Sequence, residues 1–410
     1  MPWKESTAVE ERKQFIEAWQ KQEDSLAELC RKFGISRQTG YKLIERFEEE
    51  GDPGLKDRSR APGHSPQAMS EEVIEALVGL RAEHPRWGPR KLRAYLRGQA
   101  PDQHWPAVSS IGELLKREGL VRARRKRQRT PAYSAPLEHA TTPNRVWCAD
   151  FKGWFLCGNG EKCTPLTITD ACSRYLIRCQ SVDKADTVRS RAIFEAAFRE
   201  YGLPHAIRSD NGAPFASPAP AGLSQLSVWW ICLGITPERI ERGCPEQNGR
   251  HERMHETLRQ ETADPPAGTL RQQQLNMLRF QESYNWERPH EALQYRTPGS
   301  LYAPSGRPYP TRLPEPEYPR GSIYRWISGD GQMRWANERV FLTKVLAGQQ
   351  VGLVPIEETL YEIYFGPVFL GWYEESANQF VADPGKPNRR RRGRQTKSEQ
   401  PGEAAALFPS

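Results

Sequence analysis

The order of strand-like and helix-like segments between residues 144 and 262 constrains the fold more than any other feature of this chain. Apolar, β-branched runs separated by turn residues predict strands, and longer runs with helical periodicity predict helices. The predicted elements are, in order, strands at 146–155, 162–169 and 175–182, a helix at 187–201, a strand at 205–210, a helix at 226–233, a strand at 235–240 and a helix from about 249. This order predicts an α/β layer fold with a mixed sheet.

The last of these helices carries a carboxylate in a distinctive setting. His251, Met254 and Leu258 fall at i, i+3 and i+7, so they should share the stripe that packs inward. Glu252 lies off that stripe, in the first turns, where the positive end of the helix favours an acidic side chain. The surrounding arginines (250, 253 and 259) suit phosphate groups.

Two acidic residues precede Glu252 at strand positions. Asp150 lies within the first strand, where a charge is costly unless it belongs to a site. Asp210 ends the fourth strand, the usual place for functional groups in open α/β sheets. Carboxylates gathered closely repel one another unless divalent cations neutralise them, and an oxygen-only ligand set favours magnesium or manganese over zinc. Taken singly, Asp150 and Asp210 could equally cap turns.

The front of the chain reads as two helical units. In residues 8–50, a helix ends at Gly34 and the next begins after Ser36, a pattern typical of a helix-turn-helix. An ordinary helical hairpin is the alternative, and Gly40 inside the second helix weakens the assignment. A second such unit is predicted between residues 71 and 117. The residues expected to contact DNA there are Arg37, Gln38, Tyr41 and Lys42 in the first unit and Arg90 and Lys91 in the second.

Charge supports a polyanionic partner. The net charge is +8 and the isoelectric point is near 9.0, with basic runs at 122–129 and 386–397. The first run should lie along DNA phosphates through Arg124, Arg125, Lys126 and Arg127.

The sequence also suggests where the protein resides. No apolar run approaches the roughly 20 residues of a membrane span, and the N-terminus lacks the apolar segment of a signal peptide. The eight cysteines form no Cys-x-x-Cys pair, so reduced, buried thiols of a cytoplasmic protein are expected. A zinc site at Cys157 and Cys163 is the less favoured reading, given their spacing.

The C-terminal third changes character again. A proline-dense segment at 303–320 predicts a linker, and short strands from 322 to 375 predict a small all-β, SH3-like domain. The expected boundaries are 1–55 and 68–121 for the helix-turn-helix domains, 122–143 for a basic linker, 144–300 for the α/β core, 320–382 for the β domain and 383–410 for a disordered basic tail.

Several motifs, each weak alone, together resemble those of bacterial insertion-sequence transposases of the retroviral-integrase superfamily. They are Trp147 to Lys152, Thr167 to Tyr175, Arg208 to Gly212, Pro245 to Leu258 and Tyr284 to Leu293. The resemblance covers residues 144 to about 300 and extends to the front half through the tandem helix-turn-helix units.

This resemblance implies a ribonuclease H-like core whose Asp150, Asp210 and Glu252 hold two Mg²⁺ or Mn²⁺ ions. It implies cleavage at the ends of an insertion sequence and transfer of the freed 3′-hydroxyl to target DNA, with no covalent protein–DNA intermediate. Double-stranded DNA and further copies of the chain, in a synaptic complex, are the implied partners. Asn248, Arg250 and Arg253 become candidates for gripping the DNA end.

Alternatives remain for both the residues and the function. In the sequence, 35 residues separate Asp210 from Glu246, an interval often seen in such triads, whereas 41 separate it from Glu252. The motif position and the rigidity of a helix favour Glu252. Asp170 reads instead as a hairpin-turn residue. A non-catalytic DNA-binding regulator and a nuclease that cuts without strand transfer are the competing functions.

Overall fold

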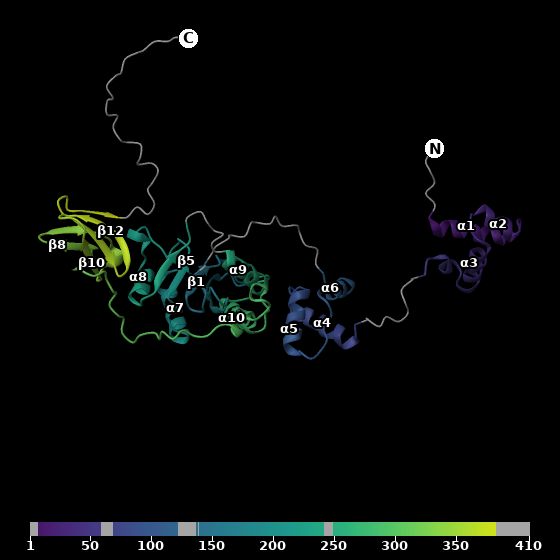
Figure 1. Cartoon of the computed structure of the whole chain (residues 1–410), viewed down its shortest axis with the longest axis horizontal. Coiled ribbons are helices and arrows are strands. Elements are labelled where there is room, and N and C mark those ends of the chain that lie inside the picture. The colour runs from purple at the N-terminus through teal and green to yellow at the C-terminus, as the bar shows by residue number, and fades with distance from the viewer. Residues whose placement is uncertain (1–6, 59–68, 122–136, 138, 242–248, 383–410) are drawn as a thin grey trace, which may run out of the picture. The chain divides into compact units, whose positions relative to one another are not determined.

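The computed structural model describes residues 7–58, 69–121, 137, 139–241 and 249–382 (Figure 1). The expected phosphate-binding run 122–129, Glu246, Asn248 and the tail 383–410 lie outside the described residues. The chain divides into two compact units, Met1–Glu71 and Glu72–Ser410. No described helix is long and apolar enough to cross a membrane.

The first unit consists of the predicted helices around a small apolar core. Its elements are α1 (Ala8–Gln20), α2 (Leu26–Lys32), α3 (Arg37–Glu50) and the 3-10 turn η1 (Asp52–Leu55). Ser36 caps α3 by accepting a hydrogen bond from the Thr39 amide at 3.1 Å. A Cβ on Gly40 would lie 2.6 Å from the Cys30 sulfur. Gly40 therefore permits the close approach of α2 to α3. This packing explains why a glycine, which is unfavourable in a helix interior, occupies this position.

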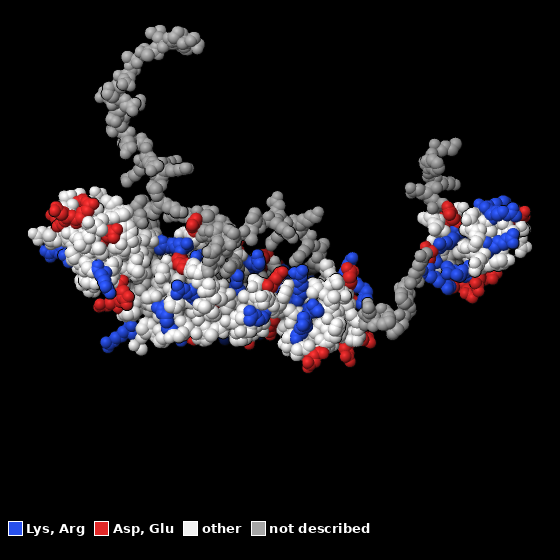
Figure 2. All heavy atoms as spheres, viewed as in Figure 1, with Lys and Arg blue, Asp and Glu red and all other residues white. Residues whose placement is uncertain are grey.

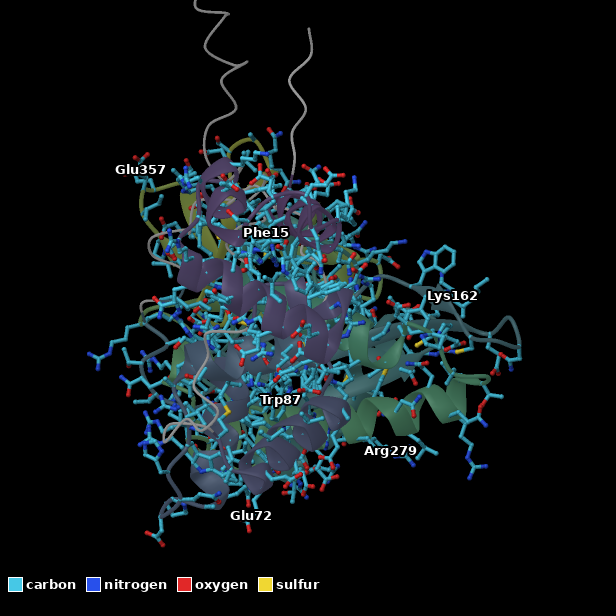
Figure 3. The ribbon with its side chains drawn as sticks, turned by 90° about the vertical axis from the view of Figure 1, so that its right-hand side faces the viewer. Phe15, Glu72, Trp87, Lys162, Arg279 and Glu357 are labelled. Atoms are coloured by element: carbon cyan, nitrogen blue, oxygen red, sulfur yellow. The ribbon has the colours of Figure 1, made fainter. Side chains whose placement is uncertain are left out.

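The second helical segment begins the larger unit. It contains α4 (Glu71–Glu83), α5 (Pro89–Gln99) and α6 (Val108–Arg117), as predicted. Trp87, labelled in Figure 3, is buried between α4 and α5 and stacks on the ring of His84 at a centroid distance of 3.8 Å. This stacking closes the turn that leads into α5.

The predicted mixed sheet forms the centre of the larger unit. Its strands are β1 (Val146–Phe151), the short β2 (Phe155–Leu156), β3 (Lys162–Asp170), β4 (Leu176–Val182), β5 (Ala206–Ser209) and β6 (Thr236–Arg239). The pairs β4–β3 and β3–β1 are antiparallel, whereas β1–β5 and β5–β6 are parallel. Because β1 and β5 run in the same direction, their carboxyl ends meet at one edge of the sheet.

Helices cover both faces of this sheet, and the side chains of β1 alternate between the two faces. Trp147 and Ala149 face a core cluster completed by α7 (Thr187–Tyr201) and α8 (Gln225–Cys232). On the opposite face, α9 (Gly249–Thr262) and α10 (Leu270–Trp286) pack over β3 and β4. Since side chains alternate along a strand, Cys148 and Asp150 belong to the α9 face.

The free edge of β4 is covered by amide side chains from α10. Gln274 accepts hydrogen bonds from the amide and hydroxyl of Ser181, and Gln281 donates to the carbonyls of Leu176 and Ile177. Asn285 accepts from the Leu176 amide at 2.8 Å and donates to its carbonyl at 3.0 Å. An unpaired edge would otherwise invite strand pairing with other chains.

Replacing Asn285 by alanine is therefore expected to destabilise the core. The buried Leu176 amide would lose its acceptor, a loss of about 1–3 kcal/mol, whereas its carbonyl would keep Gln281. Urea unfolding of the purified protein measures the difference. Arg279→Ala, an exposed change on the same helix (Figure 3), should stay within about 0.5 kcal/mol of the parent. Equal stabilities for the two variants would contradict the role assigned to Asn285.

The C-terminal region is all-β, as predicted. A five-stranded antiparallel sheet has the order β13-β12-β11-β10-β7, and β8 pairs with β9. The bounds are β7 (Ile323–Trp326), β8 (Gln332–Trp335), β9 (Glu338–Phe341), β10 (Gln350–Pro355), β11 (Leu360–Phe365), β12 (Val368–Glu374) and β13 (Gln379–Ala382). The SH3-like description stays a prediction.

These strands share an apolar cluster with the α/β core. Val228, Ile231 and Cys232 of α8 belong to the same buried cluster as Leu353 and Phe365, and Figure 1 shows α8 beside β10 and β12. The predicted linker 303–320 is also fastened to the core, because the Arg307 guanidinium donates to the carbonyls of Pro204, Leu233 and Gly234. It is thus a packed connection rather than a free tether.

Candidate active site

The register of two parallel strands places Asp150 beside Asp210. Ala149 of β1 pairs with Ser209 of β5, so the residues that follow them, Asp150 and Asp210, leave the same edge of the sheet. Adjacent strands lie about 4.8 Å apart. Both backbones therefore bring a carboxylate to the carboxyl ends of neighbouring parallel strands, where ligands bind in open α/β sheets.

Helix α9 runs past this edge with the orientation expected from its sequence. His251, Met254 and Leu258 are all buried, with exposed fractions of 3%, 3% and 1%. Glu252 lies in the first turn and is exposed. The inward stripe is thus confirmed, and Glu252 projects from the flank of a helix that the sheet holds in place.

A polar cluster joins α9 to the strand opposite Asp150. Thr167 is the cross-strand partner of Asp150, and its hydroxyl lies 2.6 Å from His251 Nε2 and 2.6 Å from His255 Nε2. The same hydroxyl oxygen lies 3.2 Å from the Asp150 carbonyl oxygen. His255 Nδ1 lies 3.9 Å from Asp150 Oδ2. The helix that carries Glu252 therefore contacts the strand that carries Asp150 through buried side chains.

Burial controls the protonation of this region. It lowers the pKa of His251 to about 3 and that of His255 to about 2, so both imidazoles are neutral near pH 7. Burial also raises the pKa of Asp210 above the ordinary 3.8, against a hydrogen bond from the Gly212 amide at 3.2 Å. The folded protein thus binds this proton more tightly than the unfolded chain, so the stability that the protonated Asp210 contributes is present below the ordinary carboxyl pKa and is lost as the pH rises through the folded pKa.

The residues at this edge provide a donor set suited to a hard divalent cation. Asp150, Asp210 and Glu252 offer carboxylate oxygens, which Mg²⁺ and Mn²⁺ prefer. The raised pKa of Asp210 fits a carboxylate whose charge a cation would stabilise. Within the described parts of the chain, no three His, Cys, Asp or Glu side chains already stand close enough to hold a metal.

Asp170, the rival aspartate, has a structural environment. It is 1% exposed, and its carboxylate accepts hydrogen bonds from the amides of Asn144 and Ser173, each at 2.7 Å, and from the Ser173 hydroxyl at 2.6 Å. These bonds hold the turn between β3 and β4. The prediction of a hairpin-turn residue is confirmed.

The thiols considered for zinc lie in an apolar cluster. Cys157 and Cys163 pack with Met254, Leu258 and Met277 beneath α9 and α10. Burial raises the pKa of Cys157 and raises that of Cys163 to about 12. Because thiolate is the form that binds metals, these thiols are poor ligands in this state. Every described cysteine except Cys172 is buried.

Comparisons with protein families match the architecture segment by segment. Two families described as integrase core domains match residues 140–245 and 233–298. A helix-turn-helix domain matches residues 11–63, and a homeodomain-like domain matches residues 39–115.

Relatives from insertion elements match over more than half of the chain. A protein of insertion element IS476 from Xanthomonas euvesicatoria is 30% identical over 254 residues, covering 60% of this chain and 67% of the relative. The chain belongs to the integrase-core transposases of insertion elements. A protein of IS407 from Burkholderia multivorans is 29% identical over 240 residues, covering 58% and 83% of the two chains. The transposase InsD of IS2 from Escherichia coli is 26% identical over 248 residues, covering 55% and 77%.

Solved structures with partial similarity include viral integrases. The HTLV-2 integrase catalytic core domain in complex with magnesium is 16% identical, with a TM-score of 0.32, and the match covers 39% of this chain and 97% of that one. A chain of a simian T-cell lymphotropic virus intasome is 14% identical, with a TM-score of 0.36, over 75% and 99%.

In the transposase, the residues predicted to read DNA in the first unit share one exposed surface. Arg37, Gln38, Tyr41 and Lys42 all lie exposed on the first turns of α3, and Tyr41 is 64% exposed. They are spaced i, i+1, i+4 and i+5, so they lie on one side of the helix. Figure 2 shows Lys and Arg side chains gathered on this unit.

The predicted residues of the second unit lie beside the α/β core. Arg90 Nη1 is 3.4 Å from Glu291 Oε1. Lys91 is half-buried, and burial followed by the nearby Arg288 lowers its pKa to about 8. Arg90 is thus exposed to solvent beside Glu291, whereas Lys91 is partly withdrawn from solvent.

The remaining predicted DNA contacts divide between described and undescribed residues. Arg253 is exposed next to Glu252 on α9. Arg124, Arg125, Lys126, Arg127 and Asn248 lie outside the described residues, as does the side chain of Arg250.

Sequence reasoning missed His255 and Thr167 as neighbours of the site. The inward stripe predicted from the sequence includes His251 but gives it no role, and it does not include His255. The available signal was the i, i+4 spacing of two histidines on the helix that carries Glu252. Their shared partner, 84 and 88 residues away, could not be read from local periodicity.

Proposed function

We propose that this transposase binds the ends of its insertion sequence and cuts and joins DNA with Asp150, Asp210 and Glu252 as metal-binding catalytic residues. The observation that carries the proposal is the pairing of Ala149 with Ser209, because it brings Asp150 and Asp210 to adjacent strand ends. Support for Glu252 comes from its exposed position on α9, one turn before His255.

Each carboxylate would have a defined task. Asp150 and Asp210 offer oxygens from the rigid sheet edge, and Glu252 closes the donor set from the helix. Two divalent cations, Mg²⁺ or Mn²⁺, would supply activation of the attacking oxygen and stabilisation of the leaving oxygen at a phosphodiester. Arg253 lies next to Glu252, where it can contact a phosphate of the DNA end.

Water would be the first nucleophile, at the element's end, and the freed 3′-hydroxyl the second, at the target. In the joining step the 3′-hydroxyl would attack a target phosphodiester and displace one of its ester oxygens, so one phosphodiester bond forms as another breaks and no protein–DNA covalent intermediate is needed. Because two element ends must be joined to one target, the protein is expected to act as an oligomer on paired ends. Sedimentation of the DNA-bound protein as a monomer would oppose this.

The proposed domain organisation follows the predicted boundaries: helix-turn-helix domains at 1–55 and 68–121, a basic linker at 122–143, the catalytic core at 144–300, the β domain at 320–382 and the tail at 383–410. The shared cluster of α8 with the C-terminal strands suggests that the last two folded regions work as one body.

An assay with a labelled element-end duplex and Mg²⁺ tests the proposal. The account predicts cleavage at the end followed by joining to a second duplex. Cleavage without joining would favour a nuclease, and specific binding without cleavage would favour a DNA-binding regulator. EDTA should stop both reactions without displacing the DNA.

The exposed surface of α3 leads to a separate prediction about DNA affinity. Arg37→Ala is expected to weaken binding of the full-length protein to the element end by about 1–3 kcal/mol, roughly 5–150-fold, if Arg37 contacts a base. Fluorescence anisotropy at fixed salt measures it, with Glu49→Ala at the far end of α3 as control. An unchanged affinity, or an equal loss on a scrambled duplex, would contradict base reading by this helix.

A further inference from the structure

His255 lies on α9, the helix that carries Glu252, and faces Asp150 of β1. It is 5% exposed, it belongs to the helix of Glu252, and its two ring nitrogens face different partners. Nε2 is 2.6 Å from the Thr167 hydroxyl, and Nδ1 is 3.9 Å from Asp150 Oδ2. His251 shares the Thr167 contact, but its Nδ1 lies 3.3 Å from the Thr169 hydroxyl. By these contacts, His255 faces Asp150, whereas His251 faces Thr169.

The protons in this cluster can be assigned by counting. The Thr167 hydroxyl has one proton, and it can donate to only one of its neighbours. At least one imidazole must therefore donate its Nε2–H to Thr167. When the Thr169 hydroxyl donates to His251 Nδ1, at 3.3 Å, the His251 ring carries its proton on Nε2 and is that donor. The Thr167 proton then has two acceptors, His255 Nε2 at 2.6 Å and the Asp150 carbonyl at 3.2 Å.

The shorter of these two contacts favours donation to His255. In that arrangement Nδ1 carries the remaining proton of the neutral ring, and this N–H faces Asp150 Oδ2. The separation of 3.9 Å exceeds a direct hydrogen bond, so the interaction is electrostatic or passes through a bridging water. Either form favours one orientation of the carboxylate.

Neutrality suits a group in this position. Burial keeps both imidazoles uncharged near neutral pH. A neutral N–H can orient a carboxylate without neutralising it, whereas a lysine or arginine would form an ion pair with Asp150 and oppose the binding of a cation.

We propose that His255 is a positioning residue that orients Asp150 for divalent-cation binding and fixes Glu252 relative to it through α9. The inference rests on the proposed function, since it assumes that Asp150 is a metal ligand. Partners that orient metal ligands typically change metal affinity by about 10–100-fold when they are removed.

Two conservative substitutions separate orientation of Asp150 from simple packing. In His255→Asn the amide nitrogen stands near the position of Nδ1 and can still face Asp150. In His255→Gln it stands near the position of Nε2 and can still meet Thr167. The Mn²⁺ dissociation constant of each full-length variant is measured with Mn²⁺ alone, from the decrease of the electron paramagnetic resonance signal of the free ion. This measurement does not rely on activity.

The two variants are expected to differ in Mn²⁺ affinity in a fixed order. His255→Gln should raise the Mn²⁺ dissociation constant by about tenfold or more, and His255→Asn should raise it less. His255→Gln should nevertheless melt at a higher temperature than His255→Asn, because it keeps the contact with Thr167. Equal dissociation constants for the two variants, or weaker binding by His255→Asn, would overturn the inference.

His251 provides the matched control, because it is equally buried and makes the same 2.6 Å contact with Thr167. His251→Asn and His251→Gln should lower the melting temperature without the ordered change in Mn²⁺ affinity. The same ordered change at His251 would overturn a specific role for His255. Asp150→Asn separates this inference from the proposed function: if it binds Mn²⁺ as well as the parent does, the proposed metal site itself fails.

Discussion

Replacing Asp210 by asparagine is expected to reduce DNA joining at least about 10³-fold while leaving the protein folded. A divalent cation held by this carboxylate, as proposed, would contribute several kcal/mol to the stabilisation of the transition state, and each 1.36 kcal/mol corresponds to a factor of ten. Asparagine keeps the size of the side chain but loses one anionic ligand. Single-turnover joining in Mg²⁺, at saturating protein, measures the loss.

The stability of the same variant should move in the other direction. Burial raises the pKa of Asp210, so at pH 7.5 its ionised form costs stability that a neutral asparagine does not. The melting temperature of Asp210→Asn at that pH is therefore expected to equal or exceed that of the parent. The difference should shrink as the pH falls towards the ordinary carboxyl pKa. Inactivity caused by unfolding would contradict this account, as would full joining activity.

Glu252→Gln is expected to cause a comparable loss, and Glu246→Gln should not. Glu252 projects from the first turn of α9, which the buried residues His251, Met254 and Leu258 fix against the sheet. A ligand on a fixed helix is placed more accurately than one in a loop. A loss of about 10³-fold or more for Glu252→Gln follows from the same cation argument.

The Glu246 variant is the matched control, since it removes the same charge six residues earlier. It is expected to join DNA within a few-fold of the parent rate. The opposite pattern, with Glu246→Gln inactive and Glu252→Gln active, would move the third ligand into the stretch before α9. Both variants should bind the element end as the parent does, and filter binding checks this.

Local pattern predicted the elements of this fold well, for a physical reason. The burial of Trp147 and Ala149 on one face of β1 follows from alternation along a strand. The buried stripe of α9 follows from helical periodicity. Both patterns are written in neighbouring residues, so they can be read before any tertiary contact is known.

Contacts between distant segments could not be read in this way. The pairing of Ala149 with Ser209 fixes the spacing of Asp150 and Asp210, yet nothing near either residue specifies that register. The segment around Arg307 has the composition of a linker, but its guanidinium satisfies three core carbonyls. The pairing of Thr167 with the α9 histidines likewise depends on the packing of a helix against a sheet.

Joining of a pre-cut DNA end most directly tests the claim that this chain transfers DNA strands without a covalent intermediate. The substrate is an element-end duplex that already carries a free 3′-hydroxyl, incubated with the full-length protein, a target duplex and Mg²⁺. The products are denatured in detergent, without proteolysis, and separated by size. The expected result is a branched DNA product free of protein, which Asp210→Asn does not form. Joined DNA with protein covalently attached, or no joined product from a folded protein bound to the end, would contradict it.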